Sequence, residues 1–214
     1  MSRRYDCTDD TVREHAISDA AGAVRAGELV VLPTDTVYGI GADAFSPSAV
    51  ARLIETKGRG REMPVPVLIG AWRTVHGLVD DLPDDAKELI SAFWPGPLTI
   101  VLRQGSGLTW DLGDTRGTVA VRMPLEPVAL ELLSETGPLA VSSANASGQP
   151  PATTADEAYA QLGDAVAVYL DGGTSPEGLA STIIDLTSPV PRLLRTGGVA
   201  REQLAEVLGG RLAD

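Results

Sequence analysis

Short apolar segments of strand length alternate along this chain with longer segments in which apolar residues recur every three or four positions. The strand-like segments are 29–32, 37–40, 65–69, 98–103, 118–122, 139–141, 165–170, 182–186 and 192–194. The helix-like segments are 9–25, 46–56, 83–93, 127–135, 154–162 and 202–208. This alternation predicts an α/β fold in which helices pack on a sheet. Several connections between strands are too short for a helical crossover, so we expect parallel and antiparallel pairs in one sheet.

The length and composition of the chain limit the classes of protein to which it can belong. Its 214 residues fit a single domain, and 43% of them are hydrophobic, which suffices for a core without disulfides. One cysteine, Cys7, and two histidines, His15 and His76, predict neither a disulfide framework nor a metal site. No apolar run approaches the ~18 residues of a membrane span, and the first ten residues lack the apolar core of a signal peptide. We therefore expect a cytoplasmic protein.

The balance of charge argues against one broad function. Aspartate and glutamate number 29 against 17 for lysine and arginine, so the net charge is −12. Proteins that hold nucleic acid by its phosphates are usually basic, and a general nucleic-acid binder is therefore disfavoured. Lys57 and Lys87 are the two lysines, and subtracting them from 17 leaves fifteen arginines. Arginine suits forked contacts to oxyanions, although a preference for arginine codons would give the same count.

Loops rich in glycine, proline, serine, threonine and arginine follow several of the predicted strands. They span 33–41, 57–64, 142–154 and 195–198. Ligands of open α/β sheets bind in crevices at the ends of strands, so these loops are candidates for one shared site. We interpret residues 94–99, WPGPLT, as a rigid structural corner between a helix and a strand.

Three cations stand close together in the segment 57–61, KGRGR. Its glycines let the backbone approach a ligand, and its charges suit a triphosphate and a departing pyrophosphate. A solvated basic turn would have the same sequence, and the P-loop pattern GxxxxGK[ST] is absent. The segment 39–44 matches GxGxxA, but no helix begins directly on its glycines, so we favour close backbone packing there over a dinucleotide site.

Polar side chains that could bind a ligand lie in three further places. Residues 33–39 contain two threonine hydroxyls, a carboxylate and a phenol, which suit either a small polar ligand such as an amino acid or a hydrogen-bonded turn. Residues 142–148 offer hydroxyl, amide and backbone N–H groups to an anion, or cap a loop. Arg122 ends an apolar strand, where a buried cation needs a carboxylate from the protein or from a substrate. Arg195 and Ser181 leave the same two alternatives open.

In their order along the chain, these segments resemble the YrdC-like family of L-threonylcarbamoyladenylate synthases. The matching segments are PTDTVYGIG at 33–41, KGR at 57–59, PGPLT at 95–99, VAVRMP at 119–124, SSANASG at 142–148, STIIDLT at 181–187 and LLRTGG at 193–198. Each segment is short, but the ordered set is specific and covers about residues 12–200. The resemblance implies a YrdC-like α/β fold, a twisted mixed parallel and antiparallel sheet flanked by helices with a concave ligand cleft. It further implies a single domain over 1–214 that ends in a short helix.

The resemblance also implies an activity. Members of the family are nucleotidyltransferases that convert L-threonine, bicarbonate and ATP to threonylcarbamoyl-AMP and pyrophosphate, and Mg²⁺ is expected with the ATP. The product serves tRNA processing, as the first step toward N6-threonylcarbamoyladenosine at position 37 of tRNA. A separate transferase complex completes the modification, so weak or no direct tRNA binding is expected. The alternatives are a non-catalytic module that binds tRNA or double-stranded RNA, a carbamoyl-adenylating domain of the hydrogenase-maturation type, and a nucleotide sensor.

Residues that match the family motifs acquire implied roles. The implied catalytic residues are Lys57, Arg59, Ser143 and Asn145. The implied threonine-binding residues are Thr36, Arg122, Ser143 and Ser181. The implied ATP-binding residues are Lys57, Arg59, Thr118, Asn145, Thr153 and Arg195. Three residues depart from the pattern: Gly60, Met63 and Leu68 stand where many relatives have proline, asparagine and histidine.

Overall fold

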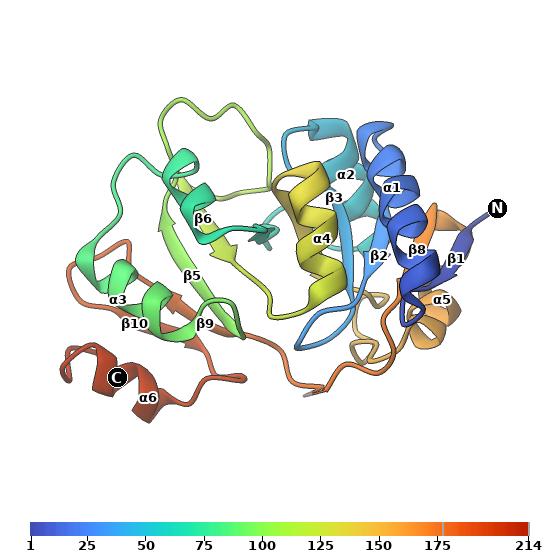
Figure 1. Ribbon diagram of the computed structural model, residues 1–214. Coiled ribbons are helices and arrows are strands. Elements are labelled where there is room, and N and C mark those ends of the chain that lie inside the picture. The colour runs from blue at the N-terminus through green and yellow to red at the C-terminus, as the bar shows by residue number, and fades with distance from the viewer. Residues whose placement is uncertain (177, 214) are drawn as a thin grey trace.

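The computed structural model describes residues 1–176 and 178–213 and contains a ten-stranded sheet with helices packed against it (Figure 1). The strands are β1 (Arg3–Asp6), β2 (Val30–Leu32), β3 (Gly39–Asp43), β4 (Val67–Leu68), β5 (Leu98–Arg103), β6 (Thr118–Arg122), β7 (Leu139–Ser143), β8 (Val168–Asp171), β9 (Thr182–Asp185) and β10 (Arg192–Arg195). The α-helices are α1 (Asp10–Arg25), α2 (Pro47–Lys57), α3 (Asp84–Phe93), α4 (Pro127–Thr136), α5 (Ala155–Leu162) and α6 (Arg201–Val207). Two 3₁₀-helices are η1 (Trp72–Gly77) and η2 (Gly163–Ala165).

The sheet is mixed, as the short connections predict. Its strand order is β1-β8-β2-β3-β7-β4-β6-β5-β9-β10. The parallel pairs are β1 with β8, β8 with β2, β4 with β6, and β5 with β9. The antiparallel pairs are β2 with β3, β3 with β7, β7 with β4, β6 with β5, and β9 with β10. Strands distant in sequence therefore become neighbours in the middle of the sheet, which brings loops from several parts of the chain together.

Each predicted helix and strand is present, with shifted ends, but three short elements were missed: β1, η1 and η2. The strand expected at 37–40 runs instead from Gly39 to Asp43. The residues before it form a turn, in which the hydroxyl groups of Thr34 and Thr36 hydrogen-bond to each other and the backbone N–H of Thr36 donates to Thr34 Oγ1. The edge strand β1 has the sequence RRYD and a mostly exposed surface, so it lacks the apolar alternation that identifies a strand. The short η1 was missed because one 3₁₀ segment carries no helical period of its own.

Period-two alternation divides the sheet residues between two hydrophobic clusters. Leu139 and Val141 of β7 point to the face that α1 and α4 cover, together with Leu68 of β4. Ala140 of β7 and its register partner Val67 belong to the larger cluster on the opposite face. Figure 1 shows α1 and α4 side by side across the front of the sheet. The first of these faces also carries the cleft described below.

The end of α2 positions the basic segment 57–61. Ser46 caps the start of the helix by accepting from the backbone N–H of Ala49, and Pro47 occupies its first turn. Gly58 ends it in the left-handed conformation, with φ of 60°, which glycine adopts without strain. The last helical residue, Lys57, is consequently buried, while Arg59 is carried beyond the helix in a new direction.

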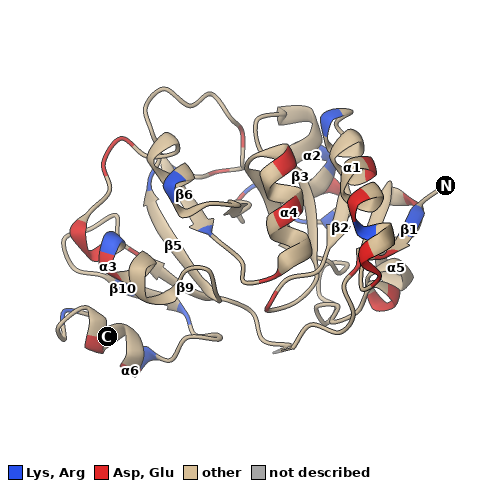
Figure 2. Ribbon diagram, in the orientation of Figure 1, with Lys and Arg blue, Asp and Glu red and all other residues tan. Residues whose placement is uncertain are grey.

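Acidic residues are spread over helices, loops and strands. Figure 2 shows them on α1, α3, α4 and α5, interspersed with fewer basic residues. Asp6, Asp43, Asp171 and Asp185 stand in strands of the sheet. Within the described part of the chain, no helix is both long enough and apolar enough to cross a membrane.

Candidate functional site

A cleft of about 350 Å³ lies on the face of the sheet that also packs against α1 and α4. Its walls come from the loops after β2 and β7, from α2's C-terminal loop, and from the ends of β6, β9 and β10. The lining residues are Thr34, Thr36, Val37, Tyr38, Gly39, Arg59, Pro66, Leu68, Thr99, Arg122, Val141, Ser142, Ser143, Asn145, Gly148, Gln149, Pro151, Ala180, Ser181 and Arg195. Among these described residues three are arginines, and none is an aspartate or a glutamate.

Most of the residues that the sequence singled out meet in this cleft. Those in its lining are Thr36, Arg59, Arg122, Ser143, Asn145, Ser181 and Arg195. They come from six separate segments of the chain, and the four loops predicted to share a site all contribute. The cleft opens on a face of the sheet and is framed by these loops, so the expectation of a crevice at strand ends is only partly accurate.

Arg122 ends β6 and is buried, with 6% of its surface exposed. Its guanidinium donates from Nη1 to Thr36 Oγ1 at 2.8 Å and from Nε to the carbonyl oxygen of Gly96 at 3.0 Å. Its Nη2 donates to Asp35 Oδ1, forming a buried ion pair. The sequence left open whether the partner of Arg122 is a protein carboxylate or a substrate. The structure supplies the protein carboxylate and still leaves Arg122 in the lining of the cleft.

Lys57 lies beside the cleft, and its implied contact with ATP remains a prediction. Its side chain is 1% exposed and lies behind the cleft, outside the lining. Nζ donates to the carbonyl oxygen of Ser143 at 2.5 Å, to Asn145 Oδ1 at 2.9 Å and to the carbonyl oxygen of Asn145. Burial, and to a smaller extent the charge of Arg59, lowers the pKa of Lys57 to about 7. Lys57 therefore holds the 143–145 loop in this structure.

The other two cations of the basic segment have separate surroundings. Arg59 lines the cleft, and its Nε is buried without a hydrogen-bond partner. Arg61 points to the surface instead, where Nη1 and Nη2 donate to the two carboxylate oxygens of Asp111 at 3.1 and 2.6 Å. The backbone N–H of Asp114 also donates to the carbonyl oxygen of Arg61 at 2.8 Å. Of the three cations in the segment 57–61, only Arg59 faces the cleft among the residues described. The segment is therefore neither a wholly solvated turn nor a set of three cations that all face the cleft.

Arg195 and Ser181 form the side of the cleft opposite the basic loop. Arg195 donates from Nε to the carbonyl oxygen of Ser181 at 2.9 Å and from Nη2 to Ser181 Oγ at 3.0 Å. Ser181 Oγ in turn lies 2.8 Å from Thr99 Oγ1. Burial, followed by the charges of Arg122 and Arg59, lowers the pKa of the Arg195 guanidinium. The positive charges of the three cleft arginines therefore repel one another, and an anionic ligand bound between them would reduce this repulsion.

The loop after β7 presents polar groups to the cleft in a fixed conformation. Asn145 donates from Nδ2 to the carbonyl oxygens of Ala146 and Gln149 at 2.9 and 2.8 Å, while its Oδ1 accepts from Lys57. Asn145 is buried and Ser143 is half-buried. The side-chain amide of Asn145 is thus used within the loop, and it contributes to the cleft chiefly by shaping that loop.

Thr118 and Thr153 do not reach the cleft lining. Thr118 begins β6, four residues from Arg122, and its hydroxyl donates to the carbonyl oxygen of Thr115 at 2.7 Å. Thr153 precedes α5, and its hydroxyl donates to Glu157 Oε2 at 3.0 Å. Their implied contacts with a nucleotide remain predictions.

Several cleft residues were not predicted as ligand-binding. Thr99 belongs to the segment interpreted as a structural corner, yet it lies in the cleft and contacts Ser181. A single hydroxyl in the apolar strand LTIVLR was the available signal. Pro66, Leu68 and Val141 supply an apolar part of the lining that no sequence motif indicated. Tyr38 lines the cleft, but its hydroxyl is engaged with Asp171, Gly172 and Gly173 behind it, and burial raises its pKa.

The fold and the cleft define the class of the protein: an α/β protein with a positively charged cleft, suited to a small ligand that carries negative charge. The chain belongs to the Sua5, YciO and YrdC family, whose sequence model is described as "Telomere recombination" and matches residues 22–197. The family expected from the ordered motifs is thereby confirmed.

Comparisons with individual proteins agree with this family membership. The chain is 60% identical to a putative threonylcarbamoyl-AMP synthase of Mycobacterium tuberculosis, over 98% of this chain and 96% of that protein. It is 38% identical to the crystal structure of P. abyssi Sua5 complexed with L-threonine, with a TM-score of 0.90 over 100% of this chain. The chain spans 62% of that longer P. abyssi protein. E. coli YciO, at 23% identity and a TM-score of 0.83, shares the fold.

Proposed function

We propose that this protein synthesises threonylcarbamoyl-AMP from L-threonine, bicarbonate and ATP, with release of pyrophosphate. The observation that carries the proposal is the convergence of seven motif residues on one cleft that holds three arginines and, among the residues described, no lining carboxylate. Relatives named threonylcarbamoyl-AMP synthase, at up to 60% identity, support it. They favour this function over the alternative of a non-catalytic RNA-binding module, as does the net charge of −12.

Threonine occupies the part of the cleft around Arg122. The guanidinium lies beside Thr36, and the Thr99–Ser181 hydroxyl pair lies in the same lining, which suits a carboxylate and a hydroxyl group on one small molecule. Apolar surface from Leu68 and Val141 is available to the methyl group. The solved complex of P. abyssi Sua5 with L-threonine supports an amino-acid site in this fold.

The ATP phosphates bind at Arg59 and Arg195. Arg59 has a buried Nε without a partner, and the charge of Arg195 is destabilised by the neighbouring guanidinium groups. A polyphosphate chain would neutralise both residues, and each could donate further hydrogen bonds to phosphate oxygens. Ser143 and the loop that Lys57 holds lie in the lining of the same cleft.

The reaction then proceeds in two bond-forming steps. Bicarbonate takes up a proton and releases water to give CO₂. The neutral threonine nitrogen attacks the carbon of CO₂, and its proton passes to water as the carbamate forms. A carbamate oxygen attacks the α-phosphorus of ATP, and the bond to the β-phosphate oxygen breaks as pyrophosphate leaves with the electron pair. Holding three substrates together can supply much of the acceleration, up to ~7–11 kcal/mol in ideal cases. Arg59 and Arg195 stabilise the charge that develops on the leaving pyrophosphate.

Magnesium is proposed to enter with the nucleotide. Mg²⁺ favours carboxylate, water and phosphate oxygens, and the described lining of the cleft contributes arginine, hydroxyl and amide groups. These side chains do not fit a protein-held magnesium site, so the ion would be held by the ATP phosphates. No step above depends on it.

The product has a defined use. A mixed anhydride of a carbamate and AMP is an activated acyl donor, so we place the protein at the first step of N6-threonylcarbamoyladenosine formation at position 37 of tRNA. A downstream transferase complex would carry out the attachment in the cytoplasm. The single domain 1–214 would then need little or no affinity for tRNA itself.

The test is pyrophosphate release from ATP in the presence of Mg²⁺ and bicarbonate, with and without L-threonine. Serine serves as the matched control substrate because it lacks the methyl group that Leu68 and Val141 would contact. We expect threonine-dependent release, with threonylcarbamoyl-AMP detected by mass spectrometry. Protein that binds ATP without releasing pyrophosphate would contradict the proposal, and tight, steeply salt-dependent binding to tRNA would favour the RNA-binding alternative.

A further inference from the structure

We propose that Asp35 is a positioning residue for substrate binding: it fixes the Arg122 guanidinium in the orientation that receives the substrate carboxylate. Asp35 does not line the cleft, so this role is exerted through Arg122. The inference rests on the proposed function in one respect, the assignment of the threonine carboxylate to Arg122.

One oxygen of Asp35 joins two parts of the structure. Asp35 is 7% exposed and lies in the connection between β2 and β3. Its Oδ1 accepts from Arg122 Nη2 and also from the backbone N–H of Leu125, at 3.0 Å. The guanidinium is thereby tied to the backbone segment that leads from β6 into α4. The second oxygen, Oδ2, is buried without a hydrogen-bond partner, so Oδ1 accepts both of these hydrogen bonds.

Three acceptors from three separate segments define the orientation of the guanidinium. Asp35 Oδ1 accepts from Nη2, Thr36 Oγ1 from Nη1, and the carbonyl oxygen of Gly96 from Nε. The guanidinium is planar, so contacts at three of its nitrogens fix both the plane and the rotation within it. Position 96 requires glycine, because a Cβ there would lie 2.6 Å from the carbonyl oxygen of Phe93. The segments 33–41, 95–99 and 119–124 therefore meet at this one side chain.

Of these three acceptors, Asp35 alone carries charge. A buried guanidinium loses several kcal/mol of solvation, and neutral acceptors compensate for only part of that loss. The Thr36 hydroxyl and the Gly96 carbonyl direct the group, whereas the Asp35 carboxylate also neutralises it. Without the carboxylate, Nη2 loses this charged acceptor, and we expect the guanidinium to leave the orientation that matches an amino-acid carboxylate.

A merely structural ion pair would have different consequences. If the pair only stabilised the fold, its loss would affect threonine and ATP alike, by reducing the amount of active protein. A positioning role predicts a selective loss for threonine, because Arg195 donates to Ser181, Arg59 Nε has no partner, and Asp35 takes part in neither arrangement.

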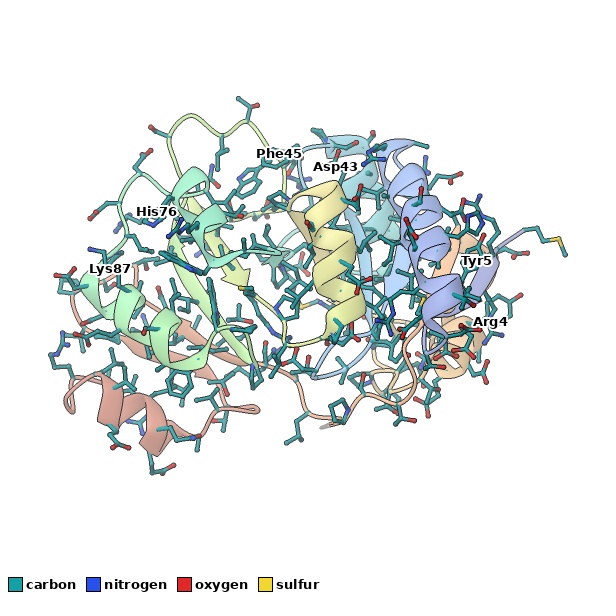
Figure 3. All side chains as sticks on the ribbon, viewed as in Figure 1. Arg4, Tyr5, Asp43, Phe45, His76 and Lys87 are labelled. Carbon is teal, nitrogen blue, oxygen red and sulfur yellow. The ribbon has the colours of Figure 1, made fainter. Side chains whose placement is uncertain are left out.

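The experiment compares Asp35→Asn with the wild type in the pyrophosphate-release assay, varying threonine and ATP separately. Asparagine keeps the shape and the acceptor oxygen but removes the charge. We expect KM for threonine to rise at least about tenfold, equivalent to ~1.4 kcal/mol, with KM for ATP within about twofold of wild type. The matched control is Asp43→Asn, because Asp43 also accepts a backbone N–H, from Phe45 at 2.9 Å, but lies outside the cleft lining (Figure 3). The control should leave both KM values unchanged.

Two further variants complete the test. In an Arg122→Gln background, Asp35→Asn should have almost no additional effect on threonine, because its action passes through Arg122. Asp35→Glu keeps the charge but moves it by one methylene; it should raise KM for threonine selectively, and it decides the question if Asp35→Asn does not fold. Equal losses for both substrates, or a full effect of Asp35→Asn without Arg122, would overturn the positioning role. Wild-type protein without threonine-dependent turnover would instead contradict the proposed function.

Discussion

Two buried cations stand next to the same cleft, and they are held in different ways. Arg122 faces a carboxylate, Asp35, together with two neutral acceptors. Lys57 donates to oxygens that are all neutral, two backbone carbonyls and the Asn145 amide. The guanidinium is charged at any pH that a protein survives, whereas burial lowers the pKa of Lys57 to about 7. The charge of Arg122 is therefore unconditional, and that of Lys57 depends on pH.

The difference extends to what each cation can do. Arg122 lies in the cleft lining, so it can touch a ligand directly. Lys57 lies behind the lining and contacts the loop that carries Ser143 and Asn145, so its effect on a ligand passes through that loop. In the sequence, both Lys57 and Arg122 were candidates for ligand contact. In the structure, Arg122 lies where a ligand could touch it, and Lys57 supports the loop beside it.

The largest effect is expected for Lys57→Met. Methionine fills much of the same volume but removes the donor that three buried oxygens share. The carbonyl oxygen of Ser143 keeps the backbone N–H of Asn145, so the cost falls on the two oxygens of Asn145, at about 1–3 kcal/mol for each. We expect turnover to fall by about two orders of magnitude, because the 143–145 loop loses its conformation. Steady-state pyrophosphate release measures the loss, and circular dichroism checks the fold.

The matched control for that variant is Lys87→Met. Lys87 is the other lysine of the chain, lies exposed on α3 and pairs with Asp84 (Figure 3). Its replacement should leave turnover unchanged. Wild-type turnover in Lys57→Met would show that the loop needs no support from this side chain, and equal losses in both variants would remove the contrast between them.

Arg59→Ala tests the contact role on the nucleotide side of the cleft. Arg59 lines the cleft with a buried and unpartnered Nε, so its removal takes charge from the phosphates without breaking a hydrogen bond of that nitrogen. We expect kcat/KM for ATP to fall about a hundredfold, and thermal stability to stay level or rise. A variant with unchanged kcat/KM for ATP would place the phosphates elsewhere.

The division between Lys57 and Arg59 marks the limit of what the sequence could predict. The alternation of apolar segments was enough for the mixed α/β sheet, since periodicity reports directly on which side chains face a core. The motif segments were also enough to identify which loops converge. The direction of each side chain depends on where α2 ends, and the left-handed Gly58 that turns the chain there is visible only in three dimensions.

Asp35 shows the same limit in a second place. Its segment, PTDTVYG, was identified as a possible ligand site, and the neighbouring hydroxyls Thr34 and Thr36 do line the cleft. The carboxylate lies outside the lining and accepts from Arg122, a lining residue 87 positions later in the chain. Pairings of this kind depend on strand order, and the order β7-β4-β6-β5 at the centre of this sheet cannot be obtained from local sequence patterns.

The pH dependence of stability should separate the two cations without any substrate. Lys57 has a pKa of about 7 in the folded chain against 10.5 when exposed, so between these values the unfolded chain binds more protons. Its contribution to the free energy of unfolding is therefore least favourable below about pH 7 and rises with pH from there to about 10.5. The Arg122 ion pair contributes no such slope, because the guanidinium does not titrate in this range.

The measurement is urea unfolding of the wild type and of Lys57→Met between pH 6 and about 10, compared as a difference at each pH. The difference removes the opposing slope of Cys7, whose thiol pKa burial raises from 9.0 to about 11, so that its contribution falls as pH increases. The difference should shift in favour of the wild type as pH rises. A flat difference would mean that the three oxygens keep Lys57 protonated throughout, which would make its charge as unconditional as that of Arg122.

The smallest effect is expected for Arg61→Ala. Arg61 pairs with Asp111 on the surface, with 53% and 43% of the two side chains exposed, and such pairs contribute about 0–1 kcal/mol. The pair fixes the far end of the loop that carries Arg59, so KM for ATP should rise by no more than about threefold at low salt. In about 0.5 M salt the variant and the wild type should converge, because the pair is screened. A loss as large as that of Arg59→Ala would mean that Arg61 leaves Asp111 for the nucleotide. In that case Arg59 and Arg61 would both contact the nucleotide, and Lys57 alone of the three cations in the segment would support the loop. The difference between contacting and supporting cations would then depend on whether ATP is bound, and not on the fold alone.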